Sequence, residues 1–247
     1  GHWFGTDVHG RDLFGRVLAG ARISLIVGLV GALVSLVIGV LWGATAGLLG
    51  GRWDNLMMRT VDVLYSLPSI IFVIVIITTL EGVLQGWLQS AFGGGSGETA
   101  RMLLLYAGLG AVSWLTMARI VRGQVLALRE AEYVEAARAM GTSTPRILFR
   151  HILPNVVSPV IVAVSFGIGS IALSEVILSF FGLGVQPPRP SLGVMIGEVT
   201  ARGNTSVSVL RDHPEQLLAP IAVVWLMIFC WNIIGDALND VLNPRAR

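Results

Sequence analysis

Residues Glu130 to Asn155 read EAEYVEAARAMGTSTPRILFRHILPN and separate two long apolar stretches of the chain. The run from Leu128 to Met140 is rich in Ala, Glu, Arg and Leu, which are strong helix formers. We expect Gly141 to adopt the left-handed conformation that ends a helix. Thr144 is expected to cap the next helix, with Pro145 at its first position. The segment therefore predicts a helix, a tight turn and a second helix, held in water between two apolar stretches.

Composition places the rest of the chain in a membrane. Its 247 residues are 54% hydrophobic and 13% charged, with a mean hydropathy of +0.76. Five segments without Asp, Glu, Lys or Arg are long enough to cross a bilayer, which takes about 20 apolar residues. Backbone groups in hydrocarbon must satisfy one another, so these segments are helices, and the alternation of a β-barrel is absent. We predict an all-α polytopic membrane protein whose spans cover about residues 23–50, 63–81, 102–120, 153–180 and 216–236.

The spans divide the chain into three parts. Residues 1–22 form an outer N-terminal segment, residues 23–238 a transmembrane domain, and residues 239–247 a tail. An odd number of spans puts the two ends on opposite sides. With the 122–154 loop in the cytoplasm, ten Arg face inward and seven outward, the bias that the positive-inside rule expects. The loop and the C-terminus are therefore predicted to be cytoplasmic.

Residue usage excludes several kinds of chemistry. All 17 basic residues are Arg and none is Lys. A P-loop nucleotide site needs a Lys, and a Schiff base needs one too, so the chain is not expected to hydrolyse ATP by itself. Cys230 is the one cysteine, which excludes a disulfide within the chain and a thiolate metal site. We predict no metal site and no nucleic-acid partner, since the Arg residues are spread between spans.

A row of small residues lies along the first predicted span, each four positions from the next. The row consists of Gly31, Ser35, Gly39, Gly43 and Gly47. Such a ridge lets another helix approach closely, either within this chain, which we favour, or in another subunit. Between later spans, Gly93 to Gly97 is expected to be a flexible outer loop, and Gly182 to Glu215 an irregular one.

The 130–155 segment resembles the EAA loop of ABC-importer permease subunits. It carries Glu135-Ala136-Ala137, then Gly141 after three residues, then Leu153-Pro154. His151 stands where the family usually has isoleucine, and an Ile follows it. The surrounding residues look like the branch that handles dipeptides, oligopeptides and nickel.

Other segments resemble the same branch, and together they cover essentially the whole chain. They are Gly5-Thr6-Asp7 with Gly10-Arg11-Asp12; Gly50-Gly51, Asp54, Arg59, Asp62 and Ser66-Leu67-Pro68; Glu175 with Leu178 to Gly184; and Gly235-Asp236 with Asn243-Pro244-Arg245.

The resemblance implies a type I ABC importer permease fold in a bacterial or archaeal cytoplasmic membrane. The family usually has six spans, so a further span is expected before residue 1. The implied partners are a second permease subunit, two ATPase subunits that bind ATP and magnesium, and an extracytoplasmic solute-binding protein. This chain itself would bind no cofactor. The residues that the resemblance assigns to the ATPase contact are Glu135, Ala136, Ala137, Arg138, Gly141, Leu153 and Pro154. Exposed small residues at the tip, among them Ala136, Ala137 and Ala139, would let the ATPase come close.

Three further groups of polar residues each have two interpretations. Glu175 lies near a span, where an ionisable residue faces a cavity or a partner, so it either lines the solute path or bonds a neighbouring helix. Asp7, Arg11 and Asp12 either dock the binding protein or cap the helix that begins near Asp12, and we favour capping. Arg119 and Arg122 either anchor the third span at the interface, which we favour, or act in gating.

Functions of other classes are weaker. Gly94-Gly95-Ser96-Gly97 matches the short pattern of rhomboid proteases, but the four His residues fall outside the spans and leave the serine without a base. A passive channel would not need a docking helix. Within the family, peptide is favoured over nickel because no cluster of His, Cys or carboxylates lines a span.

Overall fold

The computed structural model describes residues 3–7, 9–92, 97–200, 209 and 211–242. Over these residues it contains helices and a single isolated β-bridge between Thr6 and Asp12. The helices are α1 (Leu13–Leu49), α2 (Gly51–Tyr65), α3 (Ser69–Phe92), α4 (Gly97–Leu128), α5 (Glu132–Ala139), α6 (Thr144–Ile147), the π-helical η1 (Leu148–Ile152), α7 (Leu153–Phe180), α8 (Leu192–Thr200) and α10 (Glu215–Leu242). Five helical stretches within the described ranges are long and apolar enough to cross a membrane, which confirms the predicted fold class.

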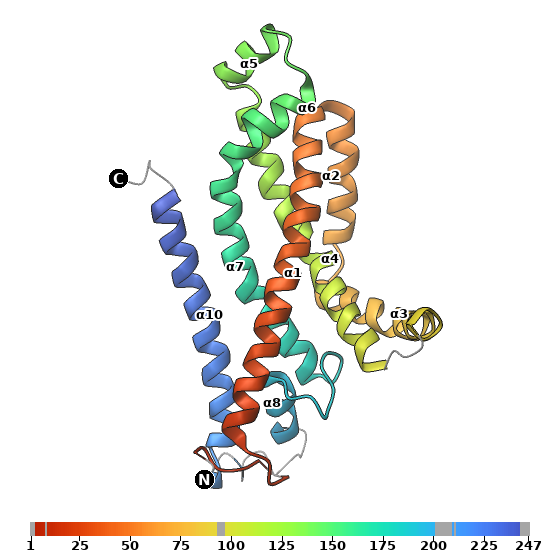
Figure 1. Ribbon diagram of the computed structural model, residues 1–247, viewed down its shortest axis with the longest axis vertical. Helices are drawn as coiled ribbons and strands as arrows, with labels where there is room; N and C mark the ends of the chain where they lie inside the picture. Colours follow the sequence, from red (N-terminus) through yellow and green to blue (C-terminus); the bar gives the residue numbers. More distant parts are fainter. Residues whose placement is uncertain (1–2, 8, 93–96, 201–208, 210, 243–247) are drawn as a thin grey trace.

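Helices α1, α4, α7 and α10 run roughly along the long axis of the molecule, whereas α3 lies across it at one side (Figure 1). The molecule therefore has two distinct ends. The hairpin, by which we mean α5, the turn at Gly141 and α6, lies at one end. The N-terminal segment and α8 lie at the other end, and α10 runs from that end toward the level of the hairpin. The first described residues and the end of α10 therefore lie on opposite sides of the bundle, as an odd number of crossings requires.

Several helix boundaries differ from the predicted spans. The first long helix begins at Leu13, because the side chain of Asp12 accepts a hydrogen bond from the Gly15 amide and caps it. Capping by Asp12, the favoured interpretation, is confirmed. The segment from Val63 is not one span: α2 ends at Tyr65 and α3 begins only at Ser69, after Pro68. Proline lacks the amide hydrogen that would continue the helix.

The loops also contain more helix than the sequence indicates. The outer segment from Gly182 to Glu215 holds α8, so the prediction of irregular structure is wrong for Leu192–Thr200. The 128–140 run is not one helix, because α4 ends at Leu128 and α5 begins at Glu132. Residues 93–96 of the predicted flexible loop and residues 243–247 of the tail lie outside the described ranges, while Gly97 opens α4.

The small-residue row packs within this chain, as favoured. A Cβ at Gly39 would lie 2.5 Å from Met117, and one at Gly47 would lie 2.9 Å from Val125, both on α4. At Gly43 an added Cβ would overlap the Ala118 carbonyl oxygen, again on α4. Nearer the start of the row, a Cβ at Gly31 would lie 2.9 Å from Ile171 on α7. Close backbone approach therefore fixes α1 against α4 and α7, and these three helices form the frame on which the polar features are mounted.

Candidate functional site

The hairpin is mounted on the bundle by two side chains of α5. Val134 and Ala137 are almost fully buried, and they belong to the apolar cluster that contains Ile147 and Ile152. The same cluster includes Val121 and Val125 of α4, together with residues of α1 and α7. An eight-residue helix is too short to be stable alone in water, so this burial is what holds α5 in place.

Glycine closes the hairpin turn as the sequence predicts. Gly141 has φ +78°, and its amide donates to the Arg138 carbonyl at 3.0 Å. The Thr142 amide donates to the Ala137 carbonyl at 3.1 Å. These two bonds form a Schellman motif, in which a left-handed residue directs the next amide back onto the helix. The turn is therefore set by the backbone of one residue.

The face of α5 that points away from the bundle is exposed. Glu135, Ala136 and Arg138 are all exposed, and Met140 has 80% of its surface in solvent. The prediction that Ala137 is exposed is wrong, because its methyl group packs into the apolar cluster. Ala137 therefore supports the exposed face rather than forming it.

The second half of the hairpin also departs from the prediction in one detail. Ser143 rather than Thr144 occupies the N-cap position of α6, and its side chain makes no capping hydrogen bond. The π-helical η1 joins α6 to α7, whose first residues are the half-buried Leu153 and the exposed Pro154. Leu153 packs against the same cluster as Val134.

A hollow of about 320 Å³ lies where α5 meets the ends of α1 and α4. It is lined by Leu48, Arg129, Glu130, Glu135 and Arg138. The Arg129 guanidinium donates to the Gly47 carbonyl at 3.2 Å, which ties the loop to the end of α1. The hollow and the exposed face of α5 are continuous, since Glu135 and Arg138 belong to both. Together they make an exposed surface of small and charged residues that suits a protein partner.

Two ion pairs join α4 to α2 on the hairpin side of the helix break. Arg122 donates through two nitrogens to both oxygens of Asp54, with the Nη2–Oδ2 distance at 2.7 Å. Arg119 donates to Asp62 at 2.8 Å, and its guanidinium carbon lies 4.1 Å from the centre of the Tyr65 ring. Planar, bidentate contact is the geometry in which Arg binds a carboxylate most strongly. Both Arg residues thus anchor α2, a role that the sequence did not assign.

Glu175 of α7 is fully buried and accepts three hydroxyl hydrogen bonds. The donors are Ser24 of α1, Ser179 of α7 at 2.7 Å, and Ser191 before α8 at 2.9 Å. Ser179 and Ser191 in turn accept from the backbone amides of Val185 and Gly193. This geometry fits the helix-bonding interpretation of Glu175 rather than an exposed position on a path.

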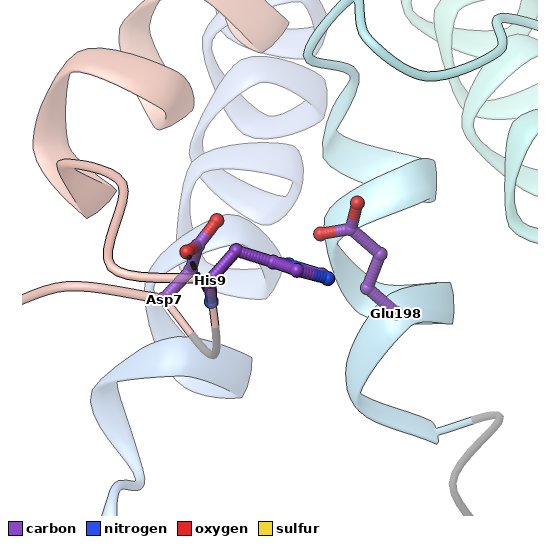
Figure 2. A group of neighbouring side chains, drawn as sticks. All are labelled: Asp7, His9 and Glu198. Carbon is purple, nitrogen blue, oxygen red and sulfur yellow. Dashed lines mark hydrogen bonds between the residues drawn. The ribbon is translucent and has the colours of Figure 1, made fainter.

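At the N-terminal end, four charged side chains form what we call the clasp: Asp7, Arg11, Arg16 and Glu198. Arg11 donates to Asp7 at 2.7 Å and to Glu198 at 3.0 Å, and Arg16 also contacts both carboxylates. Figure 2 shows Asp7 and His9 on the N-terminal loop and Glu198 across from them on α8. The clasp thus fastens residues before α1 to α8.

Electrostatics make the clasp carboxylates strongly acidic. Burial alone raises the pKa of Asp7, but hydrogen bonds from the Arg11 and His9 amides and the nearby guanidinium groups lower that pKa to about 2. Burial likewise raises the pKa of Glu198, and Arg16 and Arg11 lower it further than burial raises it. Both groups are therefore ionised at neutral pH and held by two cations.

The geometry of the clasp bears on whether these residues could bind a metal ion and on whether Asp7 could dock the binding protein. Ligand atoms of Asp7, His9 and Glu198 lie within 4.8 Å of one another, a spacing that a metal ion could use. Both carboxylates, however, already accept hydrogen bonds from Arg11 and Arg16, so the chemistry here is that of an ion-pair network. Asp7 is 9% exposed, which leaves its carboxylate little surface for docking another protein.

The sequence points to Glu175 and to the clasp residues Asp7 and Arg11, but it does not show which side chains they contact. Glu175 stood out as an ionisable residue near a span, but nothing in the sequence pairs it with Ser191, 16 positions away. Nor does anything pair Arg11 with Glu198, 187 positions away. The i,i+4 spacing of Asp7 and Arg11 was the one local signal for the clasp.

Comparison with known proteins places this architecture. The family model described as binding-protein-dependent transport system inner membrane component matches residues 35–247. The chain belongs to this family. The oligopeptide transport system permease protein OppC of Escherichia coli strain K12 is 44% identical over 247 residues, covering 100% of this permease and 74% of OppC. The dipeptide transport system permease protein DppC of Bacillus subtilis strain 168 is 39% identical over 246 residues, covering 100% and 69%.

Solved structures agree on the fold. A chain of the methionine ABC transporter MetNI in an inward-facing conformation superimposes with a TM-score of 0.62 at 18% identity, covering 92% of this permease and 97% of that chain. A chain of an amino acid ABC transporter superimposes with a TM-score of 0.57 at 16% identity, covering 92% and 94%. The predicted ABC importer permease fold is therefore confirmed.

Proposed function

We propose that this permease is the membrane subunit of an ATP-driven importer for oligopeptides or dipeptides. The relatives that match it along its whole length are named as permeases for such peptides. The observation that carries the proposal is the hairpin: a buried pair, Val134 and Ala137, fixes α5 so that Glu135, Ala136 and Arg138 face outward. We assign this face, with Gly141 and the start of α7 at Leu153 and Pro154, to contact with an ATPase subunit.

Partners supply what this chain lacks. ATP and magnesium bind on two ATPase subunits, because the chain has no Lys to form a P-loop. A second permease subunit completes the membrane part, and an extracytoplasmic solute-binding protein delivers the peptide. The hairpin and the C-terminus lie in the cytoplasm of a bacterial or archaeal cell, as the Arg distribution favours. The N-terminal end of the bundle then faces outward.

Coupling requires that the hairpin bind the ATPase differently in its open and closed states. Only such a difference in binding free energy lets ATP shift the permease between conformations. The hairpin meets the mechanical side of this requirement, because the cluster that holds α5 also contains residues of α1, α4 and α7. A movement of α5 is therefore passed to three helices of the bundle at once.

The test is a tagged membrane pull-down of the full-length permease expressed with its partner subunits. In Gly141→Pro the ring fixes φ near −65°, which is incompatible with the φ of +78° that the turn needs. We expect this variant to lose the ATPase subunits and ATP-dependent peptide uptake. Gly141→Asn is the matched control, since asparagine tolerates the left-handed region, and an added Cβ at this position meets nothing within 4 Å.

Two outcomes would contradict the proposal. Recovery of both ATPases with Gly141→Pro, at the wild-type ratio, would mean that the hairpin is not the coupling contact. Uptake of peptide at the wild-type rate without ATP would instead indicate a passive channel. Gel filtration of both variants in detergent shows whether either has simply failed to fold.

A further inference from the structure

A groove whose wall carries several hydroxyl groups among apolar side chains follows the contact between α4 and α7 at the middle of the bundle. It consists of two neighbouring cavities of about 380 and 350 Å³, which share Ser113, Thr116 and Ser170. The first cavity also has Ser69 and Ser174 in its wall, and the second has Ser35. Leu109 to Thr116 occupy the middle of α4, so the groove lies about midway along the bundle, away from both of its ends.

Several of these hydroxyls have capacity to bind a ligand. Ser113 and Ser174 donate back to carbonyls of their own helices at 2.8 and 3.0 Å, which leaves their oxygens free to accept. Ser69, Thr116 and Ser170 are exposed, and their hydroxyl groups make no hydrogen bond to another described residue. A surface that met lipid tails would gain nothing from such groups, because hydrocarbon offers no hydrogen bonds.

The break between α2 and α3 opens into the same groove. Residues Ser66 to Ser69 are exposed, and Leu67, Pro68 and Ser69 line the first cavity. Helix ends leave amide and carbonyl groups without helical partners. In a membrane protein such irregular backbone is tolerated where it is covered by protein or lines a cavity filled with water. Its place beside Leu109 of α4 shows that the break lies at the depth of the groove.

Charged residues continue the same face toward the hairpin end. About one turn beyond Thr116, Arg119 pairs with Asp62 and both side chains are exposed. These two residues, with Arg59 and Arg122, line a wider hollow of about 710 Å³. An exposed ion pair facing hydrocarbon would be costly. The groove therefore has a polar exit at its hairpin end.

We infer that the α4–α7 groove is this subunit's share of the solute pathway, and that its hydroxyls bind the main-chain amide and carbonyl groups of a peptide in transit. The inference rests on the proposed function for the peptide, while the aqueous character of the groove rests on its hydroxyls, the exposed helix break and the exposed ion pair. Hydroxyls that both donate and accept suit a main chain, which presents the same two groups whatever the side chains are. Ser170, which lines both cavities, is the position where this binding is tested.

The first experiment measures access of water to the groove in proteoliposomes that hold the whole transporter. Exposed Cys230 is replaced by Ser, and Thr116→Cys, Ser170→Cys and Leu226→Cys are made in that background. Leu226 is 51% exposed at the middle of α10, outside both cavities, and serves as the lipid-facing control. We expect the groove cysteines to react about tenfold faster than the control with sulfonatoethyl methanethiosulfonate, because the reactive thiolate forms only in contact with water.

The second experiment blocks the groove. Ser170→Trp is expected to lower ATP-driven uptake of trialanine about tenfold, because the indole fills the space that a main chain needs. Leu226→Trp should leave uptake unchanged. Trialanine with ATP should also slow labelling of Ser170→Cys.

The outcomes separate this inference from the proposed function. Groove cysteines that label no faster than Leu226→Cys would overturn the pathway, since lipid or a helix of the second permease would then fill the groove. Rapid labelling in a transporter that takes up another solute but no trialanine would leave the pathway standing and overturn the assignment to peptide. Equal uptake by Ser170→Trp and Leu226→Trp would overturn the role of Ser170.

Discussion

The two ends of this permease use charge in opposite ways. At the N-terminal end the clasp carboxylates of Asp7 and Glu198 are largely withdrawn from solvent and shared between Arg11 and Arg16. At the hairpin end Glu135 and Arg138 are exposed, and no salt bridge or hydrogen bond between side chains engages them in the described structure. Both ends close a helix with the same glycine turn, at Gly182 after α7 and at Gly141 after α5.

Under the proposed function, the difference separates a part that holds the bundle together from a part that contacts an ATPase subunit. Charges that are buried and fully paired restrict a structure to one geometry, and they cost free energy when one member is removed. Exposed charges contribute little to folding and remain available to fix the register of a partner. Substitutions at the N-terminal end should therefore change stability, and those on the hairpin should change assembly.

The largest effect is expected at Glu175, the buried acceptor that joins α7 to α1 and to the segment before α8. Glu175→Ala leaves the hydroxyls of Ser24, Ser179 and Ser191 without their shared acceptor and opens a void. We expect the free energy of unfolding to fall by about 3 kcal/mol. Thermal unfolding of the purified permease in detergent measures it.

Glu175→Gln is the matched control, because its amide oxygen can still accept from Ser179 and Ser191; we expect a loss of about 1 kcal/mol. If Glu175→Gln left stability unchanged but reduced uptake, the alternative in which Glu175 lines the solute path would gain support.

An intermediate effect is expected at Asp7. Folding lowers its pKa from 3.8 to about 2, so ionised Asp7 stabilises the native state above the unfolded pKa. That stabilisation is lost as pH falls through the folded pKa. Asp7→Asn should lower the free energy of unfolding by about 2 kcal/mol at neutral pH, and the difference from wild type should vanish between about pH 4 and pH 2.

Unfolding of both proteins is followed across that pH range in detergent. A difference that stays constant down to pH 2 would mean that Asp7 acts through packing rather than through its charge. Arg59→Gln is a control from the hairpin side of the bundle, since Arg59 is exposed and makes no ion pair in the described structure.

The smallest effect on stability is expected at Glu135. Its exposed carboxylate makes Glu135→Arg a change of less than about 0.5 kcal/mol in the free energy of unfolding. Recovery of the ATPase subunits in a pull-down should nevertheless fall about tenfold, because a reversed charge at a contact is repelled by a partner that complements the original.

Asp240→Arg makes the same change of charge on an exposed position of α10 and should not alter recovery. A Glu135→Arg variant with a clearly lower free energy of unfolding that still binds the ATPases would contradict this contrast. It would show that the charge of Glu135 stabilises the fold rather than the assembly.

Sequence signals that depend on neighbouring residues predicted the fold well, but they did not predict contacts between residues far apart in the chain. Apolar length located the crossing helices, and the fourth predicted span coincides with α7 at Leu153–Phe180. Gly141 and Asp12 were read correctly because a turn or a cap depends on residues within four positions. The prediction of a span from Val63 failed because hydropathy does not register a helix break at Pro68 within an apolar run. The sequence also could not show that Ala137 is buried, since its burial depends on which face of the short helix α5 packs against the bundle.

The join between α6 and α7 has a mechanical consequence. Helical structure is continuous from Thr144 to Phe180, and the 28 residues of α7 alone extend about 42 Å. Under the proposed function, a force applied at the hairpin is transmitted along this helical stretch to its far end. There Glu175 is hydrogen-bonded to Ser24 of α1 and to Ser191 before α8. Two features interrupt regular α-helix along this stretch: the π-helical η1 at Leu148–Ile152, and Pro159 inside α7, which lacks the amide hydrogen for a helical bond. Under the proposed function, the bending stiffness at these two points determines how much of an ATPase movement reaches the far end of α7.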